Sequence, residues 1–191
     1  MRQRLSRLML VTNLICNLFY ALSYPYIYAE ALKTVSKNYI SAEQIISCSG
    51  VVVFGILWNK IGDKLYKHYP LIILAETAAD IILMAHVLIT GNLKFYFIFN
   101  VLIYAIITRN MANGGIRLRA KVHPDEKSRE KFDNNNNIVN SVSTLLGASL
   151  SIVLKLDMTT MFVFALIGNT FDNGFYYYIY KKVNKVEGMI K

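Results

Sequence analysis

The chain has 191 residues, of which 54% are hydrophobic and 17% are charged, and its mean hydropathy is +0.36. A water-soluble domain of this length is rarely so apolar, so the composition indicates a membrane protein. The net charge of +9 is spread over several short segments. A nucleic-acid interface, which would gather its cations on one soluble face, is therefore not expected.

The sequence contains six apolar runs that could each cross a bilayer as a helix, for which ~20 mainly apolar residues are needed. Only short loops remain between them, so we expect an all-α membrane protein made of a single six-span domain. The expected spans are about 8–29, 42–58, 70–90, 94–114, 137–155 and 158–180.

The placement of Lys and Arg predicts the orientation of these spans. With a cytoplasmic amino terminus, the inside segments 2–7, 60–67, 117–131 and 181–191 hold sixteen of the 21 cations, and the outside segments hold four. Cationic loops resist translocation. We therefore expect both termini in the cytoplasm and a multi-pass protein of the cell (inner) membrane, in contact with anionic lipid.

The first span carries a polar face. Asn13, Asn17 and Tyr20 recur at spacings of three and four residues, so they lie on one side of the helix. Cys16 in this span and Cys48 in the second are expected at different depths, which predicts neither a disulfide nor a metal site. No cofactor is expected either.

Segment 55–64 is expected to form a short basic turn after the second span. It reads Gly-Ile-Leu-Trp-Asn-Lys-Ile-Gly-Asp-Lys. Glycines let antiparallel helices approach closely, and lysines hold such a turn in water beside anionic lipid. The segment resembles the signature loop of major facilitator superfamily transporters, Gly-x-x-x-Asp-Arg/Lys-x-Gly-Arg-Arg/Lys. The matching residues are Gly55, Lys60, Gly62 and Lys64, whereas Asn59 stands where the family has Asp and Asp63 where it has a cation.

Three ionisable residues lie inside the third and fourth spans. Glu76 and Asp80 are four residues apart, on one face of the third helix, and Arg109 lies in the fourth. Such groups are costly in hydrocarbon and normally face a partner or a wet cavity. At ~1.5 Å per residue, the depth of Arg109 falls between those of the two carboxylates. An ion pair is therefore allowed, either for coupling to protons or as a purely structural contact.

The residues after Arg109 extend the resemblance. Stretch 109–115 is similar to the fourth-span motif of the same superfamily, an Arg followed one turn later by Gln-Gly, with Asn113 and Gly114 in place of that pair. In the family this Arg is linked to proton coupling. Asn110 and Asn113 share a face. We expect this face and the polar face of the first span to line a cavity, with interhelical hydrogen bonds of ~0.6 kcal/mol each as the alternative.

The last two spans contain further polar residues. The fifth begins with asparagines at 134–137 and 140, which is typical of a helix that faces water or protein instead of lipid. Gly147 in this span should let a neighbouring helix approach closely. Asp172, with Asn169 and Asn173, lies midway along the sixth span, which is peripheral in the family. A dimer contact or a different packing of this segment would explain it.

The resemblance implies half of a major facilitator fold, whose twelve spans form two six-helix halves. We therefore expect a half-size secondary transporter that works as a homodimer by alternating access on a small solute or drug, with proton coupling as an option. The alternatives are a non-transporting binding or accessory subunit, or one half of a heterodimeric transporter with a second six-span chain. An enzyme is not expected, because no phosphatidyltransferase box, catalytic triad order or His-Glu-x-x-His run is present.

Overall fold

The computed structural model describes residues 2–34, 36–186 and 188, which are almost entirely helical and contain no strand. The all-α prediction is therefore confirmed for the described residues. The elements are α1 (Arg2–Thr34), α2 (Lys37–Lys67), α3 (Tyr69–Thr90), α4 (Leu93–Ile103), the π-helical segment η1 (Tyr104–Thr108), α5 (Arg109–Val122), α6 (Glu126–Leu154) and α7 (Met158–Val186).

Each expected span lies within one helical rod, because α4, η1 and α5 follow one another without interruption. The rods are longer than the apolar runs that predicted them. By length and composition, three stretches among the described residues can cross a membrane: Arg2–Ile27, Tyr69–Thr90 and Glu126–Leu154. These three helices indicate a membrane-embedded protein, and six crossings stay a prediction.

The expected turn at 55–64 is wrong, because this segment belongs to α2. The helix has a local break at Ile61 (φ −127°, ψ 17°), and it ends only at Lys67, where the His68 amide donates to the Leu65 carbonyl at 2.9 Å. A glycine costs a helix interior only ~1 kcal/mol. Burial of Trp58, which is 3% exposed, outweighs that cost. The reversal instead falls at the start of α3, where Pro70 lies in the first turn, a position that tolerates the missing N–H.

Local hydrogen bonds define the other helix ends. The side chain of Asp125 accepts the Ser128 amide at 2.7 Å and caps α6, and the side chain of Asp157 accepts the Thr160 amide at 2.9 Å at the start of α7. Gly91 ends α3 in the left-handed conformation (φ 65°), and its amide donates to the Val87 carbonyl.

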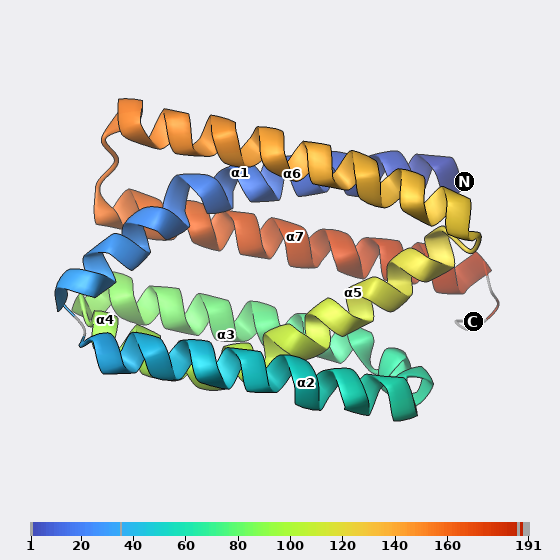
Figure 1. Cartoon of the computed structure of the whole chain (residues 1–191), viewed down its shortest axis with the longest axis horizontal. Coiled ribbons are helices and arrows are strands. Elements are labelled where there is room, and N and C mark those ends of the chain that lie inside the picture. The colour runs from blue at the N-terminus through green and yellow to red at the C-terminus, as the bar shows by residue number, and fades with distance from the viewer. Residues whose placement is uncertain (1, 35, 187, 189–191) are drawn as a thin grey trace. The chain divides into compact units, whose positions relative to one another are not determined.

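The chain divides into two compact units. Unit 1 comprises 1–24 and 115–191, and unit 2 comprises 25–114. In unit 1, α1 and α6 run in the same direction and α7 runs opposite to both (Figure 1). Phe162, Ala165 and Ile179 of α7 are each at most 1% exposed and form part of its core.

Unit 2 has the same internal pattern of directions. Helix α2 and the rod formed by α4 and η1 run in one direction, and α3 runs the other way (Figure 1). Its core includes Tyr69, Ile73, Leu83 and Met84 of α3, each at most 2% exposed.

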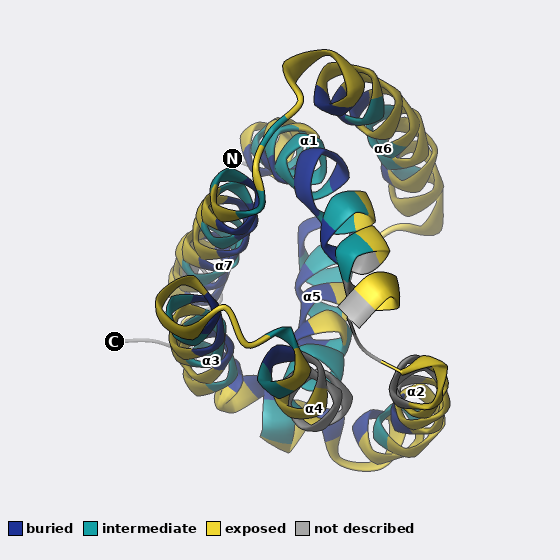
Figure 2. Cartoon of the chain, turned by 90° about the vertical axis from the view of Figure 1, so that its left-hand side faces the viewer, coloured by how far each residue is buried: buried dark blue, intermediate teal, exposed yellow. Residues whose placement is uncertain are grey.

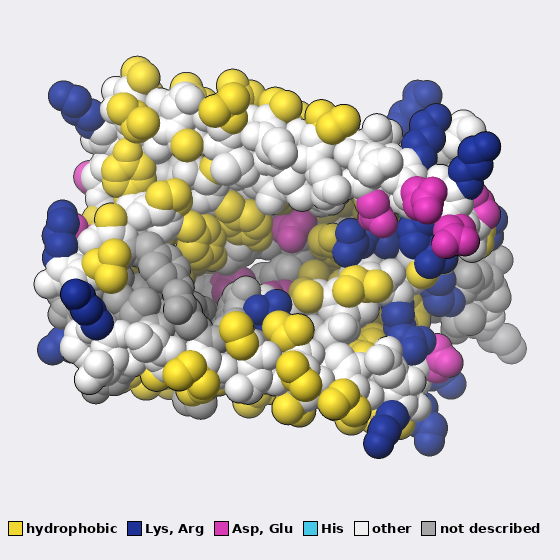
Figure 3. All heavy atoms as spheres, viewed as in Figure 1, with side chains coloured by type: hydrophobic (Ala, Val, Ile, Leu, Met, Phe, Trp, Pro, Cys, Tyr) yellow, Lys and Arg dark blue, Asp and Glu magenta, His cyan; other side chains and the backbone are white. Residues whose placement is uncertain are grey.

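The outer surface of α6 is apolar over much of its length. Leu145, Ile152 and Val153 are 69%, 70% and 76% exposed, and exposed residues cover the outer side of the helix (Figure 2). At the other end of α6, where the helix begins, Lys, Arg, Asp and Glu side chains gather (Figure 3). Large apolar side chains exposed in this way are typical of a helix that faces lipid.

Candidate functional site

The segment that resembles the transporter loop lies on the second half of α2. Asn59, Lys60, Asp63 and Lys64 are exposed, Gly55 is half-buried and Gly62 is buried. A Cβ added to Gly55 would meet nothing within 4 Å. The polar residues of the segment therefore face outward from the unit.

Trp58, in the middle of this segment, connects α2 to the predicted cavity face of the fourth rod. Its Nε1 donates a hydrogen bond of 2.8 Å to Oδ1 of Asn110. The amide nitrogen of Asn110 in turn donates to the carbonyl of Ile106, which lies in the π-helical segment. Single π-helical turns are frequent at functional sites because they interrupt the regular i→i−4 ladder. Asn110 thus ties this interruption to α2.

The three ionisable residues that are expected inside spans all lie in unit 2. Glu76 is 8% exposed, and Asp80 and Arg109 are half-buried. Glu76 and Asp80 stand one turn apart on the unbroken helix α3, as expected. Arg109 is the first residue after the π-helical segment. The ion pair between Arg109 and a carboxylate stays a prediction.

Asn113 points along its own helix, since its Nδ2 donates to the Arg109 carbonyl at 2.9 Å. Gly114 follows at a close helix contact. A Cβ at Gly114 would lie 2.2 Å from the ring of Tyr69, which is fully buried. Gly114 thus allows α5 to pack closely against α3.

The polar face of α1 is hydrogen-bonded to α6. Nδ2 of Asn13 donates to Oδ1 of Asn136, and Nδ2 of Asn17 donates to Oδ1 of Asn140, at 2.6 Å in both cases. Both contacts join residues 123 positions apart, so the two helices run parallel in fixed register. Interhelical bonding is therefore present at these two asparagines, and their place in a cavity wall stays a prediction.

The rest of this helix contact is close. A Cβ on Gly147 would lie 2.5 Å from the Cβ of Ala21 and 3.0 Å from the Leu18 carbonyl oxygen. The predicted close approach at Gly147 is confirmed, with α1 as the neighbour. Tyr20 is half-buried and packs edge-to-face with Tyr24, their ring centroids 5.5 Å apart.

A second polar cluster lies between α1 and α7. The thiol of Cys16, which is 2% exposed, lies beside the carboxylate of Asp172. Asn169 and Asn173 on the same helix are 8% and 3% exposed. The Nδ2 of Asn173 has no hydrogen-bond partner within the described part of the chain. Asp172 therefore packs inside unit 1, against the first helix.

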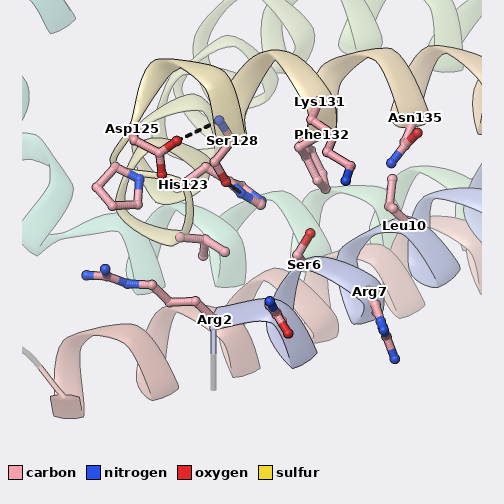
Figure 4. Close-up of a pocket in the computed structure, with 13 residues that line it drawn as sticks. Arg2, Ser6, Arg7, Leu10, His123, Asp125, Ser128, Lys131, Phe132 and Asn135 are labelled. Carbon is pink, nitrogen blue, oxygen red and sulfur yellow. Dashed lines mark hydrogen bonds between the residues drawn. The ribbon is translucent and has the colours of Figure 1, made fainter.

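A pocket of about 480 Å³ opens between the amino-terminal ends of α1 and α6. Lys131 reaches from α6 toward α1, and Arg2 lies along the edge (Figure 4). The ring of His123 lies between them, and its residue is 5% exposed. Sequence reasoning missed this pocket, because its lining comes from the first ten residues and from 122–135.

The environment of His123 disfavours its charged form. Desolvation by burial lowers the pKa of His123, and the cation Arg129 acts in the same direction, while Asp133 and Asp125 oppose it. Its Nδ1 lies 3.0 Å from the Ser128 hydroxyl, and its ring packs against Phe132 at 4.6 Å between centroids.

The chain matches no protein-family model, no curated protein and no solved structure. The paired asparagines were detectable in part from sequence, since Asn13 and Asn17 repeat the spacing of Asn136 and Asn140. Trp58 and Cys16 gave no such signal, because a lone apolar residue in a span has the same appearance whether it faces lipid or a polar partner.

Proposed function

We propose that this protein is half of a secondary transporter, which encloses a pathway for a small solute only when two six-helix bundles associate. The observation that carries the proposal is the composition of its two units. Unit 1 contains the start of the first rod, the end of the fourth, and the fifth and sixth. Unit 2 contains the end of the first rod, the second and third, and the start of the fourth.

This composition is the one that an inverted repeat produces. In such a repeat, rods one, two and three correspond to rods four, five and six. Replacing each rod by its counterpart turns the rod list of unit 1 into that of unit 2, and the reverse. The first rod passes from unit 1 to unit 2 at Pro25, and the fourth passes from unit 2 to unit 1 at Gly115. Within each unit the exchange also keeps the relative directions of the rods, since each unit holds two parallel rods and one opposed rod (Figure 1).

Nested three-helix inverted repeats are characteristic of each six-helix half of major facilitator transporters. The internal pattern thus supports the resemblance through a feature that is independent of the sequence motifs. The fold alone does not imply the function, which rests on the charges inside the spans.

Glu76, Asp80 and Arg109 are the proposed coupling groups. A carboxylate away from bulk water has a raised tendency to hold its proton, so it can respond to the occupancy of a cavity. Asp172, which lies in unit 1, is a fourth ionisable residue inside an expected span. The charges are retained in helices where each costs ~2.5 kcal/mol or more to insert, which favours a functional role.

The test is uptake by the full chain in proteoliposomes with an imposed pH gradient, with a panel of cationic dyes and small organic anions as probes. Transport of one probe should depend on the gradient and should be lost in Asp80→Asn and Arg109→Gln. Ser141→Ala, on the exposed side of α6, is the matched control. If no probe moves against its gradient and the variants behave like the parent, secondary transport is excluded for these solute classes.

The dimer is tested separately by the mass of the particle in nanodiscs, which should hold two chains of 21.8 kDa. A monomeric particle that still transports would contradict the dimer proposal. A dimer that binds a probe without moving it would favour the alternative, a binding or accessory subunit. One observation points that way, because exposed Asn59 stands where the family carries an acidic residue.

We also propose that the exposed half of α2 controls the opening of the bundle, through its break at Ile61. Gly62→Val adds a branched side chain at a buried position beside this break, so it should slow transport. Gly174→Val is the matched control, because Gly174 lies on α7, outside this segment, and a Cβ there has open space. Equal transport rates in the two variants would remove this role from the segment.

A further inference from the structure

We propose that the pocket between the amino-terminal ends of α1 and α6 binds a phosphate group. Its source is the headgroup of an anionic phospholipid or a soluble phosphorylated molecule, which share this chemistry. The inference does not depend on the transport proposal.

The first argument is the direction of the helices. The constant register of Asn13 with Asn136 and Asn17 with Asn140 shows that α1 and α6 are parallel. Their amino termini therefore meet at the same end, where the pocket lies. A helix amino terminus carries a partial positive charge, so two of them together favour an anion.

The second argument is the charge of the lining. Arg2 and Lys131 contribute cations, whereas the side chain of Arg7 points away from α6 (Figure 4). Asp125 is the one carboxylate among the described residues of the lining. That carboxylate is already engaged, because it accepts the Ser128 amide at 2.7 Å. The lining therefore has an excess of positive charge and donors that match phosphate oxygens.

The third argument is a buried nitrogen that the described chain leaves without a partner. His123 is 5% exposed and lines the pocket, and its Nε2 has no hydrogen-bond partner among the described residues. Its other nitrogen lies 3.0 Å from the Ser128 hydroxyl. If that hydroxyl donates to Nδ1, Nε2 carries the proton and is a donor. A phosphate oxygen would satisfy it, whereas a cation would not.

The experiment uses the full purified chain and two probes. Inorganic phosphate is titrated in a neutral detergent by calorimetry, and phosphatidylglycerol in phosphatidylcholine nanodiscs is followed by the number of lipids retained in native mass spectrometry. Binding of phosphate alone assigns a soluble ligand, binding of the lipid alone assigns a headgroup, and binding of both assigns a shared site. If neither probe binds, the proposal is overturned.

Variants locate the binding. Lys131→Gln should weaken affinity about 10-fold or more, as loss of a charge-assisted hydrogen bond predicts. Lys127→Gln is the matched control, since it removes the same charge from an exposed position of α6 outside the lining. His123→Gln, which keeps an N–H donor, should bind better than His123→Ala. If Lys127→Gln weakens binding as much as Lys131→Gln, the attraction is diffuse and the pocket is not a site.

Discussion

At the scale of single residues, the polar groups of the helices have two different uses. Some form short bonds between helices, as Asn13 and Asn17 do with α6. Others lie beside an unusual neighbour, as half-buried Asp172 does beside the Cys16 thiol. A hydrogen bond in a membrane helix bundle contributes little, whereas a buried charge is costly. A charged residue inside the helix bundle is therefore a stronger indication of a functional role than an asparagine.

The pair Asn17 and Asn140 offers a direct measurement. A double-mutant cycle with Asn17→Ala and Asn140→Ala should give a coupling energy of ~0.6 kcal/mol, the usual value for such a bond. Unfolding in mixed micelles is the readout. Asn113→Ala is the control, because the side chain of Asn113 bonds within its own helix in the described part of the chain. It should show no coupling to Asn140→Ala. A coupling of zero for the first pair would mean that this bond does not stabilise the bundle.

The stability of the fold should depend on pH through His123. Burial lowers the pKa of His123 in the folded chain. The unfolded chain therefore binds a proton near pH 6.5, and the folded chain binds it only at lower pH. Stability should therefore be complete above about pH 6.5 and fall as the pH drops below it, by at most ~1.4 kcal/mol per pH unit for one proton.

Melting curves between pH 5 and 8 without phosphate, measured for the parent and for His123→Gln, check this dependence. The substitution should reduce the dependence of the melting temperature on pH in the range just below about pH 6.5. His68→Gln, at an exposed position, should leave it unchanged. An unchanged slope in His123→Gln would assign the pH dependence to other groups.

At the scale of elements, small residues decide which helices can touch. Gly147 of α6 lies against α1, Gly168 of α7 lies against Phe19 of α1, and Gly114 lies against Tyr69. Each contact brings a backbone close to a neighbouring side chain, which is how membrane helices pack without a hydrophobic driving force between them. The same residue type fails as a helix terminator in α2, where Gly55 and Gly62 lie inside the helix.

Gly147→Ala tests this packing. The added methyl group would overlap Ala21, so the helices must separate and stability should fall by ~1–3 kcal/mol, as in overpacked cores. Gly174→Ala is the matched control on α7, because nothing lies within 4 Å of the new Cβ. It should be neutral or stabilising by up to ~1 kcal/mol through helix propensity. Thermal unfolding that ranks the two variants in the opposite order would contradict the close approach.

At the scale of the whole molecule, the two units share one internal plan. Each places two parallel rods beside one opposed rod and takes its members from both halves of the chain. Rods one and five can be parallel only if the chain reverses an even number of times between them, as it does when each rod crosses once. The plan is thus consistent with six crossings, whereas three helices among the described residues are long and apolar enough to cross a membrane.

Topology can be measured with single cysteines in a background that lacks Cys16 and Cys48. Probes at exposed Lys64 and Lys127 should react from the cytoplasmic side, and probes at exposed Asn92 and Lys155 from the outside, because the cationic segments resist translocation. A membrane-impermeant maleimide applied to intact cells and to inverted vesicles gives the readout. Labelling of Lys64 and Lys127 positions from opposite sides would exclude the six-span arrangement and the transporter proposal with it.

The sequence alone determined the number of helical rods, their approximate middles and the close contact at Gly147, because apolar runs and small residues act locally along the chain. The tertiary structure decided where α2 ends, which asparagines pair and where Asp172 packs. The energies that settle these points come from partners far along the chain. Burial of Trp58 and its bond to Asn110 favour the continuation of α2 past two glycines. No local pattern within residues 55–64 predicts that contact.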